Sequence, residues 1–222
     1  MRTKLRERTL PDYTKGEETF NMVSHIVGGA IGVAALVLCV IRSAVHHNGF
    51  GLAGSIVFGV SMILLYTMSS VYHGLRDGMA KRVMQVLDHC TIYLLIAGTY
   101  TPILLSAMRP IDPVSTWVLF AVIWVLAALA TTLTAIDLHQ FRVFSMVCYL
   151  GMGWAAIFKL PLMIEALGWP GFILILLGGV SYTVGAVLYG VGKTKRYMHS
   201  VFHLFVILGS VLHTLAILLY AL

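Results

Sequence analysis

Two histidines four residues apart, His199 and His203, open the last long apolar stretch of this 222-residue chain. On an α-helix this spacing places both imidazoles on one face, one turn apart, where they can reach a single metal ion. Residues 201–222 contain no Lys, Arg, Asp or Glu, and ionisable groups at the end of a membrane helix usually have a function. An isolated HxxxH pattern is equally compatible with histidines that only hydrogen-bond at a membrane interface, so the rest of the chain must decide.

The composition identifies the class of protein that must position these histidines. Hydrophobic residues make up 59% of the chain and charged residues only 11%, whereas soluble domains carry about 25% charged residues. We therefore expect an all-α polytopic membrane protein that folds as one helix bundle. The net charge of +6 lies in short loops between apolar stretches, which argues against nucleic acid as a partner. The three cysteines are scattered in apolar runs and predict neither a disulfide framework nor a thiolate zinc site.

Apolar stretches predict seven membrane spans after a hydrophilic N-terminal arm at residues 1–19. The spans cover residues 20–41, 50–72, 83–108, 114–136, 143–158, 171–191 and 199–221, with a turn at 159–170. Seven spans place 12 of the 15 Lys and Arg residues on one side of the membrane. By the positive-inside rule this side and the N-terminus are cytoplasmic and the C-terminus is outside. We expect one transmembrane domain, residues 20–222, in the cell (inner or plasma) membrane.

This topology brings polar residues of four spans to one depth, at the cytoplasmic side. These residues are Asn21, His25, His73, Asp88, His199 and His203. Three imidazoles with one open position form the arrangement of catalytic zinc, in which water takes the fourth place. Asp88 can hold that water or accept its proton. Ser69 lies four residues before His73 on the same helix face and can support the site by a hydrogen bond.

These motifs together resemble the progestin and adipoQ receptor family, and its bacterial hemolysin III branch in particular. The resemblance rests on Glu17-x3-Asn21-x3-His25, on Ser69-x3-His73 with Asp88, and on His199-x3-His203, and it covers essentially the whole chain. It implies a seven-helix bundle with zinc near the cytoplasmic side. The zinc is bound by His73, His199, His203 and a water associated with Asp88, with Ser69 beside them. Adiponectin receptors of the family are linked to ceramide hydrolysis and other members to steroid signalling. Receptor ligands are not carried over, because the sequence shows none of the long N-terminal regions of receptor members.

The remaining polar residues of this end have less specific roles. His25 could be a fourth ligand, a hydrogen-bond donor beside the metal, or a link between the first and seventh spans, and we favour a structural or indirect role. Asn21 and Glu17 share its helix face and belong to the same network. His213 lies about 15 Å deeper by helical rise and on another face, so we expect a buried, hydrogen-bonded histidine there.

The residues point first to a zinc-dependent hydrolase that acts on an amide or ester of a membrane lipid entering from the bilayer. The resemblance implies that this hydrolase is ceramidase-like. An alternative is a non-enzymatic membrane sensor or regulator of lipid homeostasis, in which zinc is structural and has four protein ligands. A pore-forming hemolysin has the least support, since no span carries a polar stripe along its full length. A retinal-binding pump is excluded because the seventh span lacks a lysine. The oligomeric state stays open.

Overall fold

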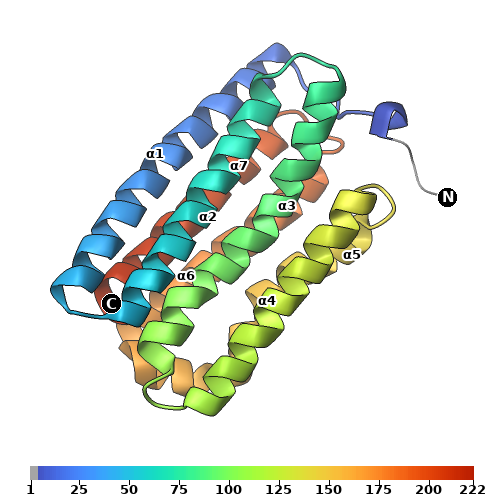
Figure 1. Cartoon of the computed structure of the whole chain (residues 1–222). Helices are drawn as coiled ribbons and strands as arrows, with labels where there is room; N and C mark the ends of the chain where they lie inside the picture. The colour runs from blue at the N-terminus through green and yellow to red at the C-terminus, as the bar shows by residue number, and fades with distance from the viewer. Residues whose placement is uncertain (1–4) are drawn as a thin grey trace.

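The computed structural model of the chain describes residues 5–222, and it is built from helices joined by short connections (Figure 1). After a short turn of 3-10 helix, η1 (Leu5–Glu7), the long helices follow in chain order. They are α1 (Lys15–Val45), α2 (Gly49–Gly74), α3 (Met79–Pro102), α4 (Pro113–Ile136), α5 (Arg142–Gly153), α6 (Leu160–Val191) and α7 (Met198–Ala216). Residues 5–222 contain no β-strand, which confirms the predicted all-α class. Arg2 and Lys4 of the predicted arm lie outside the described residues.

Local side-chain caps explain where the helices begin. Thr14 and Glu17 form a reciprocal capping box at the start of α1, so helix replaces the end of the predicted arm from Lys15 onward. The side chain of Asn48 accepts from the Gly51 backbone N–H at 2.8 Å and starts α2. Asp112 caps α4 in the same way, followed by a proline in its first turn.

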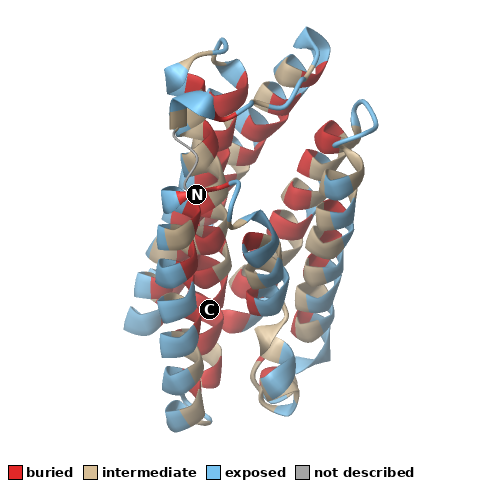
Figure 2. Ribbon diagram, turned by 90° about the vertical axis from the view of Figure 1, so that its right-hand side faces the viewer, coloured by how far each residue is buried: buried red, intermediate tan, exposed pale blue. Residues whose placement is uncertain are grey.

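Six helical segments of residues 5–222 are long and apolar enough to cross a membrane. Their outward faces expose large apolar side chains, among them Val33 and Ile41 of α1 and Val118 and Val125 of α4. Figure 2 shows the buried residues along the inward faces of the helices and the exposed ones on the outside. Soluble proteins rarely expose such continuous apolar surface, so the chain is a multi-span membrane protein.

The fifth of these segments, Arg142–Val191, differs from a single straight span. Its 50 residues would extend about 75 Å as one helix, more than twice the apolar thickness of a bilayer. The segment is interrupted by 3-10 helix η3 (Ala155–Lys159) and by Gly168, whose φ of 64° is non-helical. The turn predicted at 159–170 was wrong in its extent, because a proline in the first turn starts α6 already at Leu160.

Two other spans end in wide helical turns rather than in α-helix. The predicted third span continues beyond Pro102 as π-helix η2 (Ile103–Met108), because proline removes a backbone donor. The predicted last span ends in π-helix η4 (Ile217–Ala221).

A glycine lets α1 and α2 pack closely below the histidine-rich end. A Cβ added at Gly28 would lie 2.5 Å from Cδ1 of Tyr66, whose side chain is fully buried. The neighbouring Gly29 faces the same tyrosine at an ordinary 3.8 Å. Gly28 therefore permits the close approach of α1 to the Tyr66 ring of α2.

We expect Gly28→Ala to destabilise the protein by about 1–3 kcal/mol, because the Tyr66 ring must move in a packed core. Thermal unfolding of the purified protein in detergent measures this loss. Gly29→Ala is the matched control and should unfold within about 0.5 kcal/mol of the wild type. Equal losses in the two variants would contradict the close contact.

Candidate metal centre

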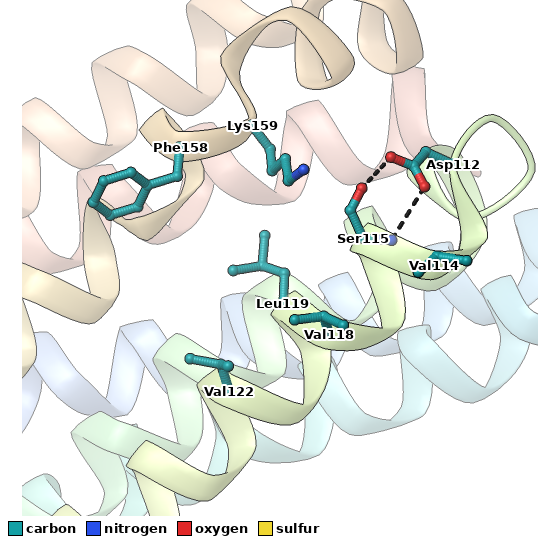
Figure 3. Close-up of a pocket in the computed structure, with 8 residues that line it drawn as sticks. All are labelled: Asp112, Val114, Ser115, Val118, Leu119, Val122, Phe158 and Lys159. Carbon is teal, nitrogen blue, oxygen red and sulfur yellow. Dashed lines mark hydrogen bonds between the residues drawn. The ribbon is translucent and has the colours of Figure 1, made fainter.

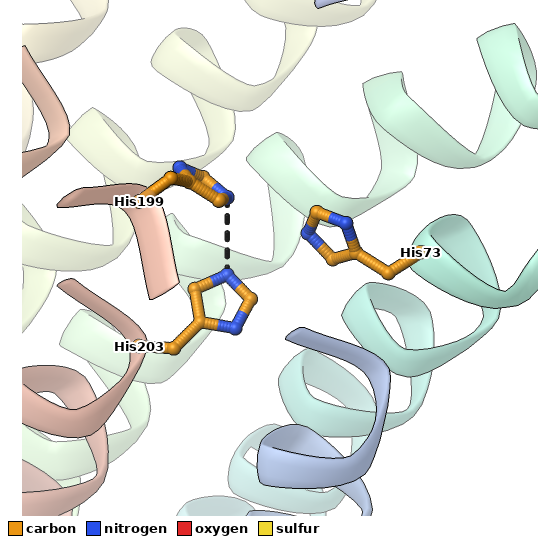
Figure 4. Close-up of side chains that lie close together, drawn as sticks. All are labelled: His73, His199 and His203. Atoms are coloured by element: carbon orange, nitrogen blue, oxygen red, sulfur yellow. Dashed lines mark hydrogen bonds between the residues drawn. The ribbon is translucent and has the colours of Figure 1, made fainter. Parts of the chain in front are cut away.

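Three imidazoles from two helices converge in the buried end of the bundle. The last turn of α2 provides His73, and the first two turns of α7 provide His199 and His203 (Figure 4). One ligand nitrogen from each lies within 4.8 Å of the others, and the Nε2 atoms of His199 and His203 are 3.1 Å apart. All three residues are buried. The structure thus brings together the three histidines that the sequence selected.

The start of α7 is fixed by the first turn of α1. One carboxylate oxygen of Glu17 accepts the backbone N–H of Tyr197 at 2.7 Å, and the other lies 3.3 Å from the Arg196 guanidinium. Tyr197 adopts φ 62°, a left-handed conformation that non-glycine residues rarely take. The contact holds the α6–α7 connection where α7 must begin for both of its histidines to face α2. Glu17 therefore links the first turn of α1 to the start of α7.

Hydrogen bonds on the far side of the rings set the imidazole tautomers. His73 Nδ1 lies 2.5 Å from a carboxylate oxygen of Glu18, so this nitrogen is the donor. His203 Nδ1 faces the Ser24 hydroxyl at 3.4 Å, and that hydroxyl itself donates to the Asn21 carbonyl. A neutral histidine that donates from Nδ1 presents a lone pair at Nε2. The Nε2 atoms of His73 and His203 can therefore accept a hydrogen bond or bind a metal ion.

Several buried polar atoms at this end have no hydrogen-bond partner among residues 5–222. They include Nε2 of His73, Nδ1 of His199, both ring nitrogens of His25 and the side-chain amide of Asn21. Buried polar groups are normally paired, so unpaired ones indicate an additional group such as an ion or water. A cation between the three Nε2 atoms would satisfy His73 and separate the two facing nitrogens of α7. The donor set thus fits a divalent metal.

Asp88 and Ser69 lie beside the three imidazoles. Asp88 of α3 interacts with the Ser69 side chain and electrostatically with His73. Its carboxylate is 18% exposed and lies 4.0 Å from His89 Nδ1. The group of converging ligand atoms contains only the histidines, without this carboxylate. Asp88 therefore stands next to the candidate centre, where it can contact a molecule bound there.

The other histidines selected from the sequence do not belong to the group of converging ligand atoms. The His25 ring stacks on His203 with centroids 3.7 Å apart and contacts the Tyr66 ring edge-on. This stack packs the first helix, α1, against His203 of α7. His213 bonds through Nε2 to the Ile175 carbonyl at 3.0 Å, so the predicted hydrogen-bonded histidine of α7 is confirmed, in a partly buried position.

Three residues that contact the histidines were not selected from the sequence: Tyr13, Glu18 and Ser24. Lys81, which contacts Glu18, was not selected either. The Tyr13 ring stacks on His199 with centroids 4.9 Å apart and also faces His73. Burial raises the pKa of the Tyr13 phenol well above its ordinary value, so it remains neutral. Tyr13 precedes α1 and follows no helical period, and no motif marks it.

A groove lies at the opposite end of the bundle (Figure 3). Valines of α4, among them Val118, form its floor, and Phe158 and Lys159 overhang it. It adjoins the start of α4, whereas the three histidines lie where α2 ends and α7 begins. This groove is therefore separate from the candidate metal centre.

The fold and the site together define a multi-span helical membrane protein with a buried cluster of three histidines. A model of the haemolysin-III related family matches residues 13–214. The chain is 36% identical to "Hemolysin-3" of Bacillus cereus over 93% of its length and 92% of that protein. It is 33% identical to "Hemolysin-3 homolog" of Bacillus subtilis (strain 168), with 94% and 96% covered. A human relative, "Monocyte to macrophage differentiation factor", is 25% identical over 72% of this chain and 67% of its own. The chain belongs to the haemolysin-III related family, as its motifs indicated.

We expect His203→Ala to abolish binding of one divalent metal per chain, because the remaining two imidazoles form an incomplete ligand set. His25→Ala should still bind one metal, since the His25 ring stacks beside the group without offering a ligand atom to it. Metal content of the purified variants, measured by mass spectrometry, gives the answer. Loss of metal in both variants would make His25 a ligand and contradict the three-histidine centre.

Proposed function

We propose that this chain is a zinc-binding membrane hydrolase that cleaves an amide or ester of a membrane lipid. His73, His199 and His203 would hold the ion. The observation that carries the proposal is the convergence of exactly three buried imidazoles with no fourth protein ligand in the group, within the described residues. Three protein ligands with one open position are typical of catalytic zinc, whereas structural zinc has four.

The nitrogen geometry supports zinc as the metal. Two nitrogens on a tetrahedral zinc lie about 3.3 Å apart when each Zn–N distance is about 2.0–2.1 Å. The Nε2 atoms of His199 and His203 are 3.1 Å apart, close to that separation. Lone pairs at Nε2 of His73 and His203 are the donors that such an ion requires.

The residues around the histidines have matching roles in hydrolysis. Zinc bound there would supply a Lewis acid that polarises the scissile carbonyl and activates water. Asp88 would accept a proton from the attacking water and return it to the leaving group, as a general base and acid. Ser69, which interacts with Asp88, would orient the carboxylate. The apolar helices around the site would take the acyl chains of a lipid that enters from the bilayer.

The second candidate function is a non-enzymatic sensor or regulator of lipid homeostasis, with zinc as a structural element. It requires a fourth protein ligand, for which the sequence offers His25 and Asp88. His25 lies parallel to His203 in a stack, a position that favours packing over ligation. The open position therefore favours the hydrolase.

Zinc-loaded protein in vesicles with ceramides and acyl esters of phospholipids tests the proposed reaction. We expect release of fatty acid by the wild type and a decrease of at least about 100-fold in Asp88→Asn, because general acid–base catalysis contributes about 10²–10⁴-fold. His213→Ala is the control outside the ligand group and should keep the activity. Fatty acid release that persists in Asp88→Asn and His203→Ala would contradict the mechanism. Leakage of a trapped dye without hydrolysis would indicate a pore instead.

We further propose seven membrane crossings, with the N-terminus in the cytoplasm, the C-terminus outside and the protein in the plasma membrane. The interrupted segment Arg142–Val191 is long enough for two crossings. Seven crossings would place 12 of the 15 Lys and Arg residues on the side of the three histidines, which by the positive-inside rule is cytoplasmic.

Single cysteines in a background without Cys39, Cys90 and Cys148 test this topology in intact cells. We expect Gln140→Cys and Lys193→Cys to resist a membrane-impermeant thiol reagent, because both flank the long segment on the cytoplasmic side. Trp169→Cys, at the exposed break within the segment, should react. Reaction of only one of the two flanking cysteines would show that the segment crosses once.

A further inference from the structure

Glu18 contacts the candidate metal centre from behind His73. One carboxylate oxygen lies 2.5 Å from His73 Nδ1, and the other lies 2.5 Å from the ammonium of Lys81. The Lys81 side chain is only 4% exposed and also donates to the Leu75 carbonyl at 3.1 Å. Three elements thus meet at this carboxylate: the first turn of α1, the last turn of α2 and the first turn of α3.

Each member of this chain of contacts fixes the next one. Lys81 is held by the carbonyl in the α2–α3 connection, and its charge compensates the partly buried carboxylate. The carboxylate keeps the proton of His73 on Nδ1 and fixes the ring plane, so that Nε2 points toward His199 and His203. A carboxylate that accepts from a metal-binding imidazole also increases the basicity of the ligand nitrogen.

From this geometry we infer that Glu18, supported by Lys81, is the positioning residue that makes His73 a metal ligand. The inference rests on the proposed zinc site and adds residues to it that the motif pattern did not include. The neighbouring Glu17 has a different role, because its carboxylate serves Thr14, Arg196 and Tyr197 and touches none of the three histidines. Of these two adjacent glutamates, Glu18 therefore contacts the candidate metal ligand His73, and Glu17 contacts the α6–α7 connection.

Glutamine cannot replace Glu18 in this position. The carboxylate offers one acceptor oxygen to His73 and the other to Lys81, and both partners are donors. A glutamine side chain has only one oxygen, and its NH₂ group would face the second donor. Glu18→Gln therefore leaves either the imidazole or the ammonium opposite another donor, and the ring loses its fixed orientation.

The test compares Glu18→Gln with Asp77→Asn in the full-length protein in detergent. Asp77 is the matched acid-to-amide control, because its carboxylate lies 3.6 Å from the same Lys81 ammonium but its side chain is 83% exposed. Zinc affinity is measured by competition with a chromogenic chelator, and thermal unfolding of the metal-free protein is measured in parallel. We expect a 10–100-fold lower zinc affinity in Glu18→Gln, the range found for partners behind metal-bound histidines. Asp77→Asn should leave the affinity within about 3-fold of the wild type, because an exposed ion pair contributes little. Lys81→Met should lower the affinity in the same direction as Glu18→Gln.

Cobalt(II) in place of zinc gives a second readout that general destabilisation does not alter. The visible absorption bands of the cobalt-loaded protein report ligand geometry. They should change in Glu18→Gln and remain as in the wild type in Asp77→Asn. Equal zinc affinity and an unchanged cobalt spectrum in Glu18→Gln would overturn the positioning role. A wild type that binds neither metal would instead overturn the proposed zinc site, so the two failures are distinguishable.

Discussion

The contact on which the site depends is the packing of the first turns of α1 against the end of α2 and the start of α7. The three histidines come from helices more than 120 residues apart in the chain, and neither helix positions them alone. Glu17 holds the connection before α7, and Glu18 contacts His73 at the end of α2. Two consecutive carboxylates in one helical turn thus fix the two halves of the three-histidine cluster. A polar end of this kind is stable in a membrane protein only if its charges are paired, and these glutamates are paired with Arg196 and Lys81.

Helical periodicity and charge distribution made most of the fold predictable from the sequence. Long apolar stretches between short basic loops define membrane helices, since a bilayer requires every backbone group to be bonded within its own segment. Periodicity located the end of α6 at Val191 but not its start at Leu160. Pro161 lies in the first turn of the helix and Gly168 interrupts it. Both lie within residues 159–170, which were expected to form a turn.

The cluster of three histidines was predictable from the sequence, but the residues that hold them in place were not. His199 and His203 show their common face through the four-residue spacing, and topology adds His73 at the same depth. Glu18 lies about 100° around α1 from the Glu17–Asn21–His25 stripe, so a search along one helix face passes it over. Its partners, His73 and Lys81, are more than 50 residues away, and only the folded α2–α3 connection brings them to it. Tyr13 was missed for a related reason, because it precedes the first helix and has no periodic neighbours.

The proposed function depends on a zinc ion that is held by three imidazoles and has a fourth coordination position open to water. X-ray absorption at the zinc edge of the purified wild-type protein tests it most directly, because the spectrum gives the number and type of ligands. We expect one zinc per chain, with three imidazole nitrogens at about 2.0–2.1 Å and one oxygen from water. A spectrum with four imidazole nitrogens, or a protein purified with zinc present that retains none, would contradict it.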